Sequence, residues 1–227
     1  MSSADVRRRV RAAAALLVLL SLPHFTGCAL RFQRPAVTAA ALWRPSPAVL
    51  AAMHDRCARG AALVADCLAS EMRAAGASPE AIAFAQRLPI AGFMQAFWGA
   101  EPVAVAGIRY PFRANENAAW LLVNGAPSLI DVDDYRLAPI AEIRADGTFG
   151  AIARAHPAVS LWPGDRSGAN PPAIERRPDG GERITVADRL RDGCHACAIL
   201  GEVRYAFAFD DAGRFIGTHL VSITPQD

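Results

Sequence analysis

Lysine is absent from the 227-residue sequence, so all 24 of its basic residues are arginines. Alanine is abundant as well, and we interpret this bias as genome composition without functional content. The arginines form no basic cluster beyond residue 27, whereas a nucleic-acid-binding surface needs a concentrated basic patch. The composition therefore indicates that nucleic acid is not a partner of this protein.

Long hydrophobic runs are also scarce. The longest, residues 12–22 (AAAALLVLLSL), falls short of the roughly 20 residues that span a bilayer, and no second run of that length follows. An arginine-rich stretch, residues 7–11, precedes the run, and the small residues Gly27 and Ala29 follow it. This order is typical of a secretory signal peptide, so the sequence predicts export rather than a transmembrane helix.

The residues FTGC at 25–28 resemble the lipobox of bacterial lipoproteins, in which a small residue precedes a cysteine that is lipidated after cleavage. Gly27 precedes Cys28 here, and Phe25 occupies the position where that family usually has leucine. The resemblance implies lipidation at Cys28 and, because Ala29 rather than aspartate follows, a lipid anchor in the bacterial outer membrane, on its periplasmic side. The alternative is ordinary cleavage after Ala29, which would release a soluble periplasmic or secreted protein.

We divide the chain into a signal peptide (residues 1–27), a lipidated tether (28–45) and a single α+β domain (46–227), because about 200 residues suit one core. The leader carries four arginines and one aspartate. Its removal changes the counts of 24 basic and 22 acidic residues to 20 and 21, so the net charge falls from +2 to −1. The basic isoelectric point therefore belongs to the leader.

Two helix starts open the domain. Ser46-Pro47 and Ser78-Pro79 each place an N-cap residue before a proline at the first helical position. Apolar residues follow at helical spacing, and Gly76 is a natural stop. We expect a third apolar segment, Gly92 to Trp98, to complete a helical layer.

From Val103 the apolar pattern changes to a period of two, which is typical of strands. Residues 118–133 indicate a hairpin with a tight turn at Asn124-Gly125, and a helix is expected over residues 148–155. Further strands are predicted at residues 158–162, 182–190, 202–209 and 214–223. The fold class is therefore predicted to be α+β, with an N-terminal helical layer followed by an antiparallel β-sheet.

The five cysteines suggest two disulfides once Cys28 is set aside, because four remain and an exported protein favours pairing. Cys57 and Cys67 would be about 15 Å apart on one straight helix, too far for a bond. We therefore predict a break at Arg59-Gly60 that folds two helices together and allows a Cys57–Cys67 disulfide.

The second pair, Cys194 and Cys197, lies in the stretch RDGCHACAIL at residues 191–200. Covalent haem would need histidine directly after the second cysteine, where Ala198 stands. Zinc would need two further ligands, so no metal or cofactor is expected. A thioredoxin-type pair needs a following helix that lowers the cysteine pKa, and a strand pattern begins too soon after Cys197. A small structural disulfide with a turn at Asp192-Gly193 is favoured, and redox chemistry remains the alternative.

No complete set of catalytic residues is apparent. GDRSG at 164–168 lacks the glycine spacing of a nucleophile elbow, so Ser167 is interpreted as a turn residue. DVDD at 131–134 lacks the glycine and distal glutamate of a calcium loop and is interpreted as a solvated strand end. His219 alternates in step with Phe215, which predicts a packed, hydrogen-bonded histidine, and His54 is interpreted as structural.

Two polar loops are candidates for binding, because binding residues concentrate on loops that a rigid scaffold positions. One is RANEN at 113–117, and the other carries His195 between the two cysteines. The alternative for the first is a loop capped by its own asparagine side chains. The candidate binding residues are Arg113, Asn115, Glu116, Asn117 and His195.

These features predict a cell-envelope lipoprotein that binds or scaffolds an unknown envelope protein and is not an enzyme. A thiol-disulfide oxidoreductase that uses Cys194 and Cys197 is the competing class. The cysteine-flanked loop with His195 also distantly resembles the loop that vertebrate-lysozyme inhibitors insert into the enzyme cleft, although the cysteine spacing differs. That resemblance implies a loop-borne inhibitor of an envelope hydrolase such as lysozyme.

Overall fold

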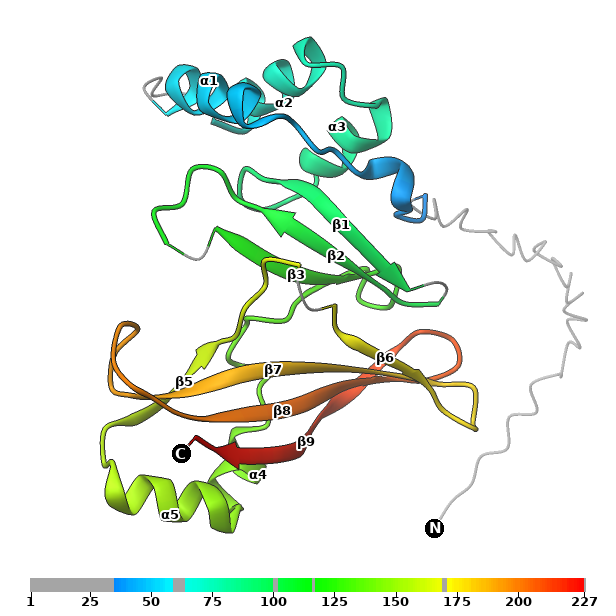
Figure 1. The fold of residues 1–227 in the computed structure, drawn as a ribbon. Coiled ribbons are helices and arrows are strands. Elements are labelled where there is room, and N and C mark those ends of the chain that lie inside the picture. The colour runs from blue at the N-terminus through cyan, green and yellow to red at the C-terminus, as the bar shows by residue number, and fades with distance from the viewer. Residues whose placement is uncertain (1–34, 59–63, 100–101, 116, 169–170, 227) are drawn as a thin grey trace, which may run out of the picture. The chain divides into compact units, whose positions relative to one another are not determined.

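Helices and antiparallel sheets alternate along the chain (Figure 1). The computed structural model describes residues 35–58, 64–99, 102–115, 117–168 and 171–226, so the expected signal peptide and Cys28 lie outside the described residues. The helices are the 3-10 helix η1 (Ala39–Ala41), α1 (Pro47–Cys57), α2 (Val64–Ala74), α3 (Pro79–Ala85), α4 (Ile140–Ala145) and α5 (Gly147–Ala155). The strands are β1 (Phe93–Gly99), β2 (Ala104–Arg109), β3 (Ala118–Val123), β4 (Leu129–Asp131), β5 (Val159–Pro163), β6 (Ala173–Arg176), β7 (Glu182–Asp192), β8 (Ile199–Phe209) and β9 (Phe215–Pro225).

The fold is a mixed α+β arrangement with two antiparallel sheets. The first sheet has the order β1-β2-β3-β4, and the second has the order β5-β7-β8-β9 with β6 also paired to β7. The sequence indicated one sheet after one group of helices, whereas α4 and α5 stand between the two sheets in chain order. None of the helices in the described part of the chain is long and apolar enough to cross a bilayer.

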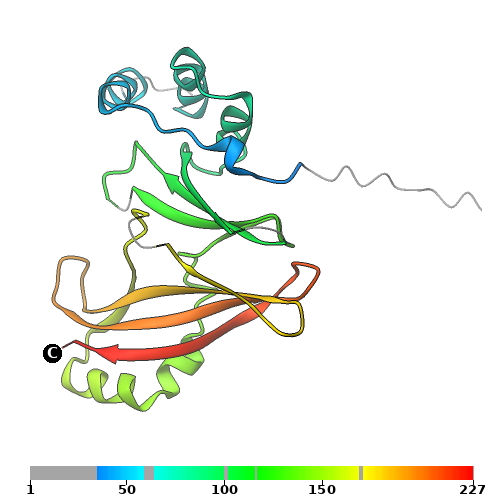
Figure 2. The same ribbon diagram turned by 45° about the vertical axis from the view of Figure 1, so that its right-hand side comes forward.

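The first sheet lies between the helices α1–α3 and the second sheet (Figures 1 and 2). On one face, Ile108 and Leu121 pack against Phe84 of α3. On the other face, Val105 and Leu122 meet the second sheet, which α4 and α5 also cover. All four inward side chains that the pattern of β8 predicted are buried in this shared core, namely Val203, Tyr205, Phe207 and Phe209.

Both predicted helix starts are present. The Ser46 hydroxyl accepts the Val49 N–H at 3.3 Å, and the Ser78 hydroxyl accepts the Ala81 N–H at 3.1 Å. Each serine thus satisfies a backbone donor that the first helical turn leaves unpaired. Ser78 also donates to the Ala40 carbonyl oxygen at 2.8 Å, which ties α3 to η1.

The expected third helix at Gly92 to Trp98 is wrong, because Phe93–Gly99 is strand β1. A short apolar segment does not by itself distinguish a strand from a buried helix. This segment forms a strand because its backbone N–H and C=O groups pair with β2, in a register that places Trp98 opposite Val105. Phe93 and Met94 follow each other and are both buried, which is typical of a strand covered on both faces.

The hairpin of β3 and β4 is present, but its tight turn is not. Val123 pairs with Leu129, so residues 124–128 form the connection instead of two residues. Asn124 does have the left-handed conformation that the sequence suggested, with φ 72°. Ala126 pairs with Arg214 in an isolated bridge, so the longer loop reaches the start of β9.

His219 is not packed as the alternation predicted, because its side chain is 64 % exposed. The register of β8 with β9 shifts between Ala208 and Phe209 and again between Arg204 and Tyr205. Each bulge inserts one residue and reverses which side chains face the core. Leu220 therefore turns inward in place of His219, whose ring contacts Glu142 at 3.3 Å.

Two disulfides join the cysteines that the sequence paired. The α-carbons of Cys57 and Cys67 are 5.6 Å apart, and those of Cys194 and Cys197 are 5.0 Å apart. Helix α1 ends at Cys57 and α2 begins at Val64, while the expected break at Arg59-Gly60 lies outside the described residues.

Removing either disulfide should destabilise the protein, and the one that closes the longer loop should cost more. The Cys57–Cys67 bond spans a sequence separation of 10 and the Cys194–Cys197 bond only 3, so chain entropy predicts losses of about 3 and about 2 kcal/mol. Urea unfolding of the two double alanine variants measures both losses. An equal or reversed order would contradict this account.

Candidate functional site

Arg166 is the centre of a buried charge network. Its side chain is only 3 % exposed, although it belongs to the loop after β5. Its Nε donates to Asp133 Oδ1 at 3.0 Å, and its Nη2 donates to Asp188 Oδ1 at 2.5 Å. Its Nη1 donates to the Ala187 carbonyl oxygen at 2.8 Å. All three guanidinium nitrogens are therefore bonded within the protein.

Both sheets contribute to this network. Asp188 lies on β7 and also accepts the Tyr205 hydroxyl of β8 at 3.0 Å. From the first sheet, Asp133 follows β4, and the Trp120 ring of β3 lies 5.0 Å from the Arg166 guanidinium carbon, within cation–π range. We call Arg166, Asp133, Asp188 and Tyr205 the Arg166 network. It joins the two sheets by charged groups inside a largely apolar interface.

Two carboxylates share one guanidinium in this network. Burial raises the pKa of Asp133 to about 6. The positive charge of Arg166 lowers this pKa, but the negative charges of Asp188 and Asp131 raise it and so oppose Arg166. Burial and the Asp188 carboxylate also raise the pKa of Tyr205 above its usual range, so its hydroxyl remains a hydrogen-bond donor.

The local sequence explains how Arg166 enters the interface. β5 pairs with β7 from Asp188 onward and β6 pairs with β7 up to Thr185, so a gap is left beside Ala187. Gly164 turns the chain into this gap, where an added Cβ would lie 2.1 Å from the Ala187 carbonyl oxygen. Arg166 then bonds that oxygen in place of a neighbouring strand.

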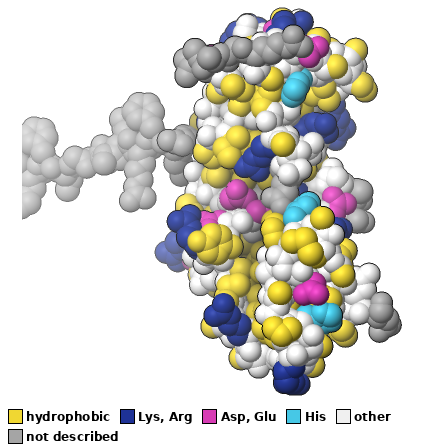
Figure 3. All heavy atoms as spheres, turned by 90° about the vertical axis from the view of Figure 1, so that its left-hand side faces the viewer, with side chains coloured by type: hydrophobic (Ala, Val, Ile, Leu, Met, Phe, Trp, Pro, Cys, Tyr) yellow, Lys and Arg dark blue, Asp and Glu magenta, His cyan; other side chains and the backbone are white. Residues whose placement is uncertain are grey.

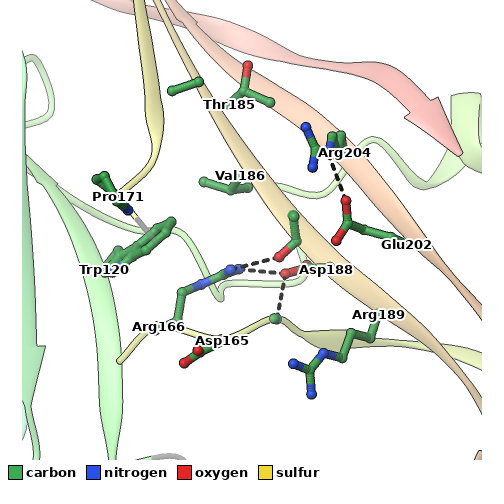
Figure 4. Close-up of a pocket in the computed structure, with 13 residues that line it drawn as sticks. Trp120, Asp165, Arg166, Pro171, Thr185, Val186, Asp188, Arg189, Glu202 and Arg204 are labelled. Carbon is green, nitrogen blue, oxygen red and sulfur yellow. Dashed lines mark hydrogen bonds and ion pairs between the residues drawn. The ribbon is translucent and has the colours of Figure 1, made fainter. Parts of the chain in front are cut away.

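A cavity of about 440 Å³ lies beside this gap, lined by Trp120, Arg166, Thr185, Arg189 and Arg204 among others (Figure 4). In Figure 4, dashed lines join Arg166 to Asp188 and Arg204 to Glu202, while Arg189 carries none. An adjoining groove of about 540 Å³ over β8 and β9 shares Arg189 and Arg204.

A third cavity of about 240 Å³ lies where the polar loops meet. Residues from four segments line it, which we call the loop cavity: Asn117 and Ala118; Asp133; Pro163 to Ser167; and Arg189, Arg191 and His195. Figure 3 views this end of the two sheets, where acidic and histidine side chains gather near the middle of the face. Arg189 lines all three cavities.

The loop with Cys194 and Cys197 forms the turn between β7 and β8. Gly193 adopts φ 83° at its start, in agreement with the expected turn at Asp192-Gly193. The Arg191 guanidinium donates to the Cys197 carbonyl oxygen at 2.8 Å, and the His195 ring lies 5.5 Å from the Trp162 ring. No helix follows Cys194 in this described segment, so the helix-dipole effect that activates thioredoxin-type cysteines is missing here.

The structure brings two of the candidate binding residues together, since Asn117 and His195 line the loop cavity from separate loops. Arg113 instead lies 4.0 Å from the Tyr110 ring centroid, and Asn115 is exposed outside this cavity. Glu116 lies outside the described residues.

The Arg166 network itself was missed. Asp133 was interpreted as part of a solvated strand end, but its side chain is 19 % exposed and ion-paired. A signal was present in β7, where Asp188 falls in phase with the core residues Ile184, Val186 and Leu190. A charge on the core face of a strand requires a buried partner, and Arg166 in GDRSG is that partner.

Two histidine–carboxylate pairs lie on the surface and, among the described residues, do not form part of a catalytic triad. His156 lies 3.2 Å from Asp192 and His219 lies 3.3 Å from Glu142, and all four side chains are more than 40 % exposed. Neither histidine hydrogen-bonds to a serine, threonine or cysteine in the part of the chain that the structure describes. Within that part, no three His, Cys, Asp or Glu side chains are placed to hold a metal ion.

Comparison with protein-family models, with curated proteins and with solved structures finds no match for this chain.

Replacing Arg166 with methionine should be strongly destabilising, because two buried carboxylates would lose the cation that pairs with both of them. Losses of this kind are about 3–5 kcal/mol. Arg136→Met is a matched control, since Arg136 is 75 % exposed in its pair with Asp134 and should cost less than about 1 kcal/mol. Urea unfolding at pH 7 distinguishes the two, and similar losses would argue against a central role for Arg166.

Stability should fall as the pH rises from 5 to 7. Asp133 has a folded-state pKa of about 6, above the ordinary aspartate value of 3.8, so its contribution is complete below about pH 4 and is lost as the pH rises through 6. The loss is at most about 3 kcal/mol at 1.4 kcal/mol per pKa unit. Asp133→Asn should flatten the curve of unfolding free energy against pH. Asp134→Asn should leave it unchanged in this window, because its exposed pair with Arg136 lowers the Asp134 pKa.

Proposed function

We propose that this protein is a non-enzymatic binding module of the bacterial cell envelope. A lipid on Cys28 would anchor it to the outer membrane on the periplasmic side, and the loop cavity with its bordering loops would contact an envelope protein. Cleavage after Ala29, giving a soluble periplasmic or secreted form, is the alternative for the anchor. In this proposal the N-terminal helical layer covers one face of the first sheet, and residues of both sheets and their loops supply the binding surface.

The single observation that carries the proposal is the meeting of two polar loops at one cavity. Asn117 and His195 are 78 positions apart in the sequence and line the same recess. The floor of that recess includes Arg166 and Asp133, which the buried network holds in place. Loops that a rigid scaffold positions in this way are where binding residues concentrate.

The geometry favours binding over thiol chemistry. The Cys194–Cys197 bond closes a turn between two long strands, and the Cys197 carbonyl oxygen accepts a hydrogen bond from the Arg191 guanidinium. An oxidoreductase would instead need one cysteine activated as a thiolate. The oxidoreductase is therefore the weaker proposal, and it predicts that the protein reduces insulin and that alanine at either cysteine abolishes this activity.

The lysozyme-inhibitor resemblance is a narrower form of the same proposal. His195 is exposed at the turn between β7 and β8, where an enzyme cleft has access to it. Full lysozyme activity at a large molar excess of the protein would remove this version.

Site-specific photo-cross-linking in intact bacterial cells tests the proposal. A cross-linking amino acid at position 195 should trap a discrete envelope protein, and the same group at position 219 should not, because His219 lies on β9 outside the loop cavity. Asn117→Ala in combination with position 195 should reduce the yield. Equal products from positions 195 and 219 would contradict a binding surface at the cavity.

The anchor is tested separately by Cys28→Ala. We expect fatty-acid labelling and outer-membrane fractionation to be lost in this variant, while cross-linking at position 195 with purified partner is retained. Labelling that persists without Cys28 would contradict lipidation at this residue.

A further inference from the structure

The lining of the loop cavity is rich in hydrogen-bond donors. Arg166, Arg189 and Arg191 contribute guanidinium groups, and His195 and Asn117 add an imidazole and an amide. The acidic side chains of the lining are Asp133 and Asp165. A recess of this composition suits a ligand group that carries several acceptor oxygens.

Most of these charged groups are already hydrogen-bonded within the protein, and Arg189 is the exception. Arg166 is fully bonded within the network. Asp165 accepts the Ser167 N–H at 2.8 Å, and this bond and the Ser167 hydroxyl hold the Asp165 pKa below its usual range. Arg189, in contrast, makes no hydrogen bond or ion pair with the residues that the structure describes, although it is only partly exposed.

The position of Arg189 is fixed by its strand. It lies in β7 opposite Trp162 of β5 on one side and Glu202 of β8 on the other. A paired strand on each side therefore fixes its backbone, so ligand binding costs little backbone conformational entropy. Arg191, two residues further along the same face, uses one nitrogen for the Cys197 carbonyl oxygen and directs the guanidinium to the same cavity.

We infer that the loop cavity binds an oxyanion, the carboxylate or phosphate group of a ligand, with Arg189 as its main contact. The inference rests on the proposed binding function and gives the class of ligand for that site. The planar guanidinium presents paired N–H donors that match two oxygens of either group. Arg191, Asn117 and His195 complete the ring of donors.

Asp133 makes this site dependent on pH. At neutral pH the single charge of Arg166 is opposed by both Asp133 and Asp188, and Asp165 opposes Arg189. The other titratable groups that act on Asp133 or respond to it are Asp131 of β4, Tyr205 of β8 and Tyr110 after β2. Protonation of Asp133, with a pKa of about 6, removes one negative charge from the lining, so oxyanion affinity should rise as the pH falls from 7.5 to 5.5.

Titration calorimetry of the purified protein with three probes tests the inference. Sulfate keeps its charge across this pH range, N-acetylglycine presents a carboxylate, and methyl phosphate presents a phosphate ester. We expect saturable sulfate binding at pH 5.5 that weakens several-fold at pH 7.5. The tighter of the two organic probes then identifies the source of the oxyanion.

Variants of two neighbouring arginines provide the control. Arg189→Gln should weaken binding by roughly tenfold or more, as expected for losing charge-assisted hydrogen bonds, and Arg189→Lys should be intermediate. Arg204→Gln should bind as the unchanged protein does, because Arg204 is paired with Glu202 and does not line the loop cavity. Melting temperatures without ligand show that each variant is folded.

The inference is overturned if no probe binds saturably at either pH, or if Arg204→Gln weakens binding as much as Arg189→Gln. Cross-linking at position 195 separates this failure from that of the proposed function. A partner that is still trapped there would leave the binding module intact and exclude only the oxyanion.

Discussion

A guanidinium buried between two sheets must be neutralised where it stands, and this requirement organises the molecule. Removing the charge of Arg166 from water costs several kcal/mol unless partners surround it. Those partners are Asp133 after β4, Asp188 on β7 and the Ala187 carbonyl oxygen, with Tyr205 completing the shell of Asp188. The segments that carry them cannot move independently without leaving a buried charge unpaired. A shift of one sheet against the other that breaks these bonds is therefore costly.

The same requirement places the polar loops. Asp133 lies close to the start of β3, so Asn117, which precedes β3, lies at the edge of the interface. Strand β7 continues from Asp188 to Arg189 and Arg191, and the turn with His195 follows. The loop cavity is thus the outer end of the buried network. Because Asp133 lines the cavity and also binds Arg166, its protonation changes both the internal charge balance and the surface that a ligand meets.

Local chemistry allowed part of this fold to be predicted from the sequence. Serine before proline predicts where α1 and α3 begin, and alternation in β8 predicts which side chains enter the core, because each depends on residues close together in the chain. Strand β1 was mistaken for a helix since its pairing with β2 is a tertiary choice. His219 was misplaced because two bulges, which no local pattern announces, reverse the alternation of β9.

The candidate site shows the same division. The loops with Asn117 and His195 were recognisable as polar segments between strands, but their convergence depends on the two sheets meeting. Arg166 was hidden in a glycine-flanked sequence that is typical of a turn, and only the inward phase of Asp188 pointed to a buried cation. A carboxylate in phase with the core residues of a strand therefore predicts a buried cation elsewhere in the chain. The convergence of the two loops, in contrast, cannot be predicted from the sequence.

The arrangement of charges is also the reason why we propose binding rather than catalysis at this site. A catalytic acid or base must reach a reacting atom, and the groups of the Arg166 network are committed to one another and largely shielded from solvent. Arg189, Arg191 and Asn117, which line the cavity, are donors that would hold a ligand without exchanging protons with it near neutral pH. In the proposed site, the buried network holds the inner side of the lining in place, and Arg189 and the remaining donors of Arg191 and Asn117 would orient the oxyanion.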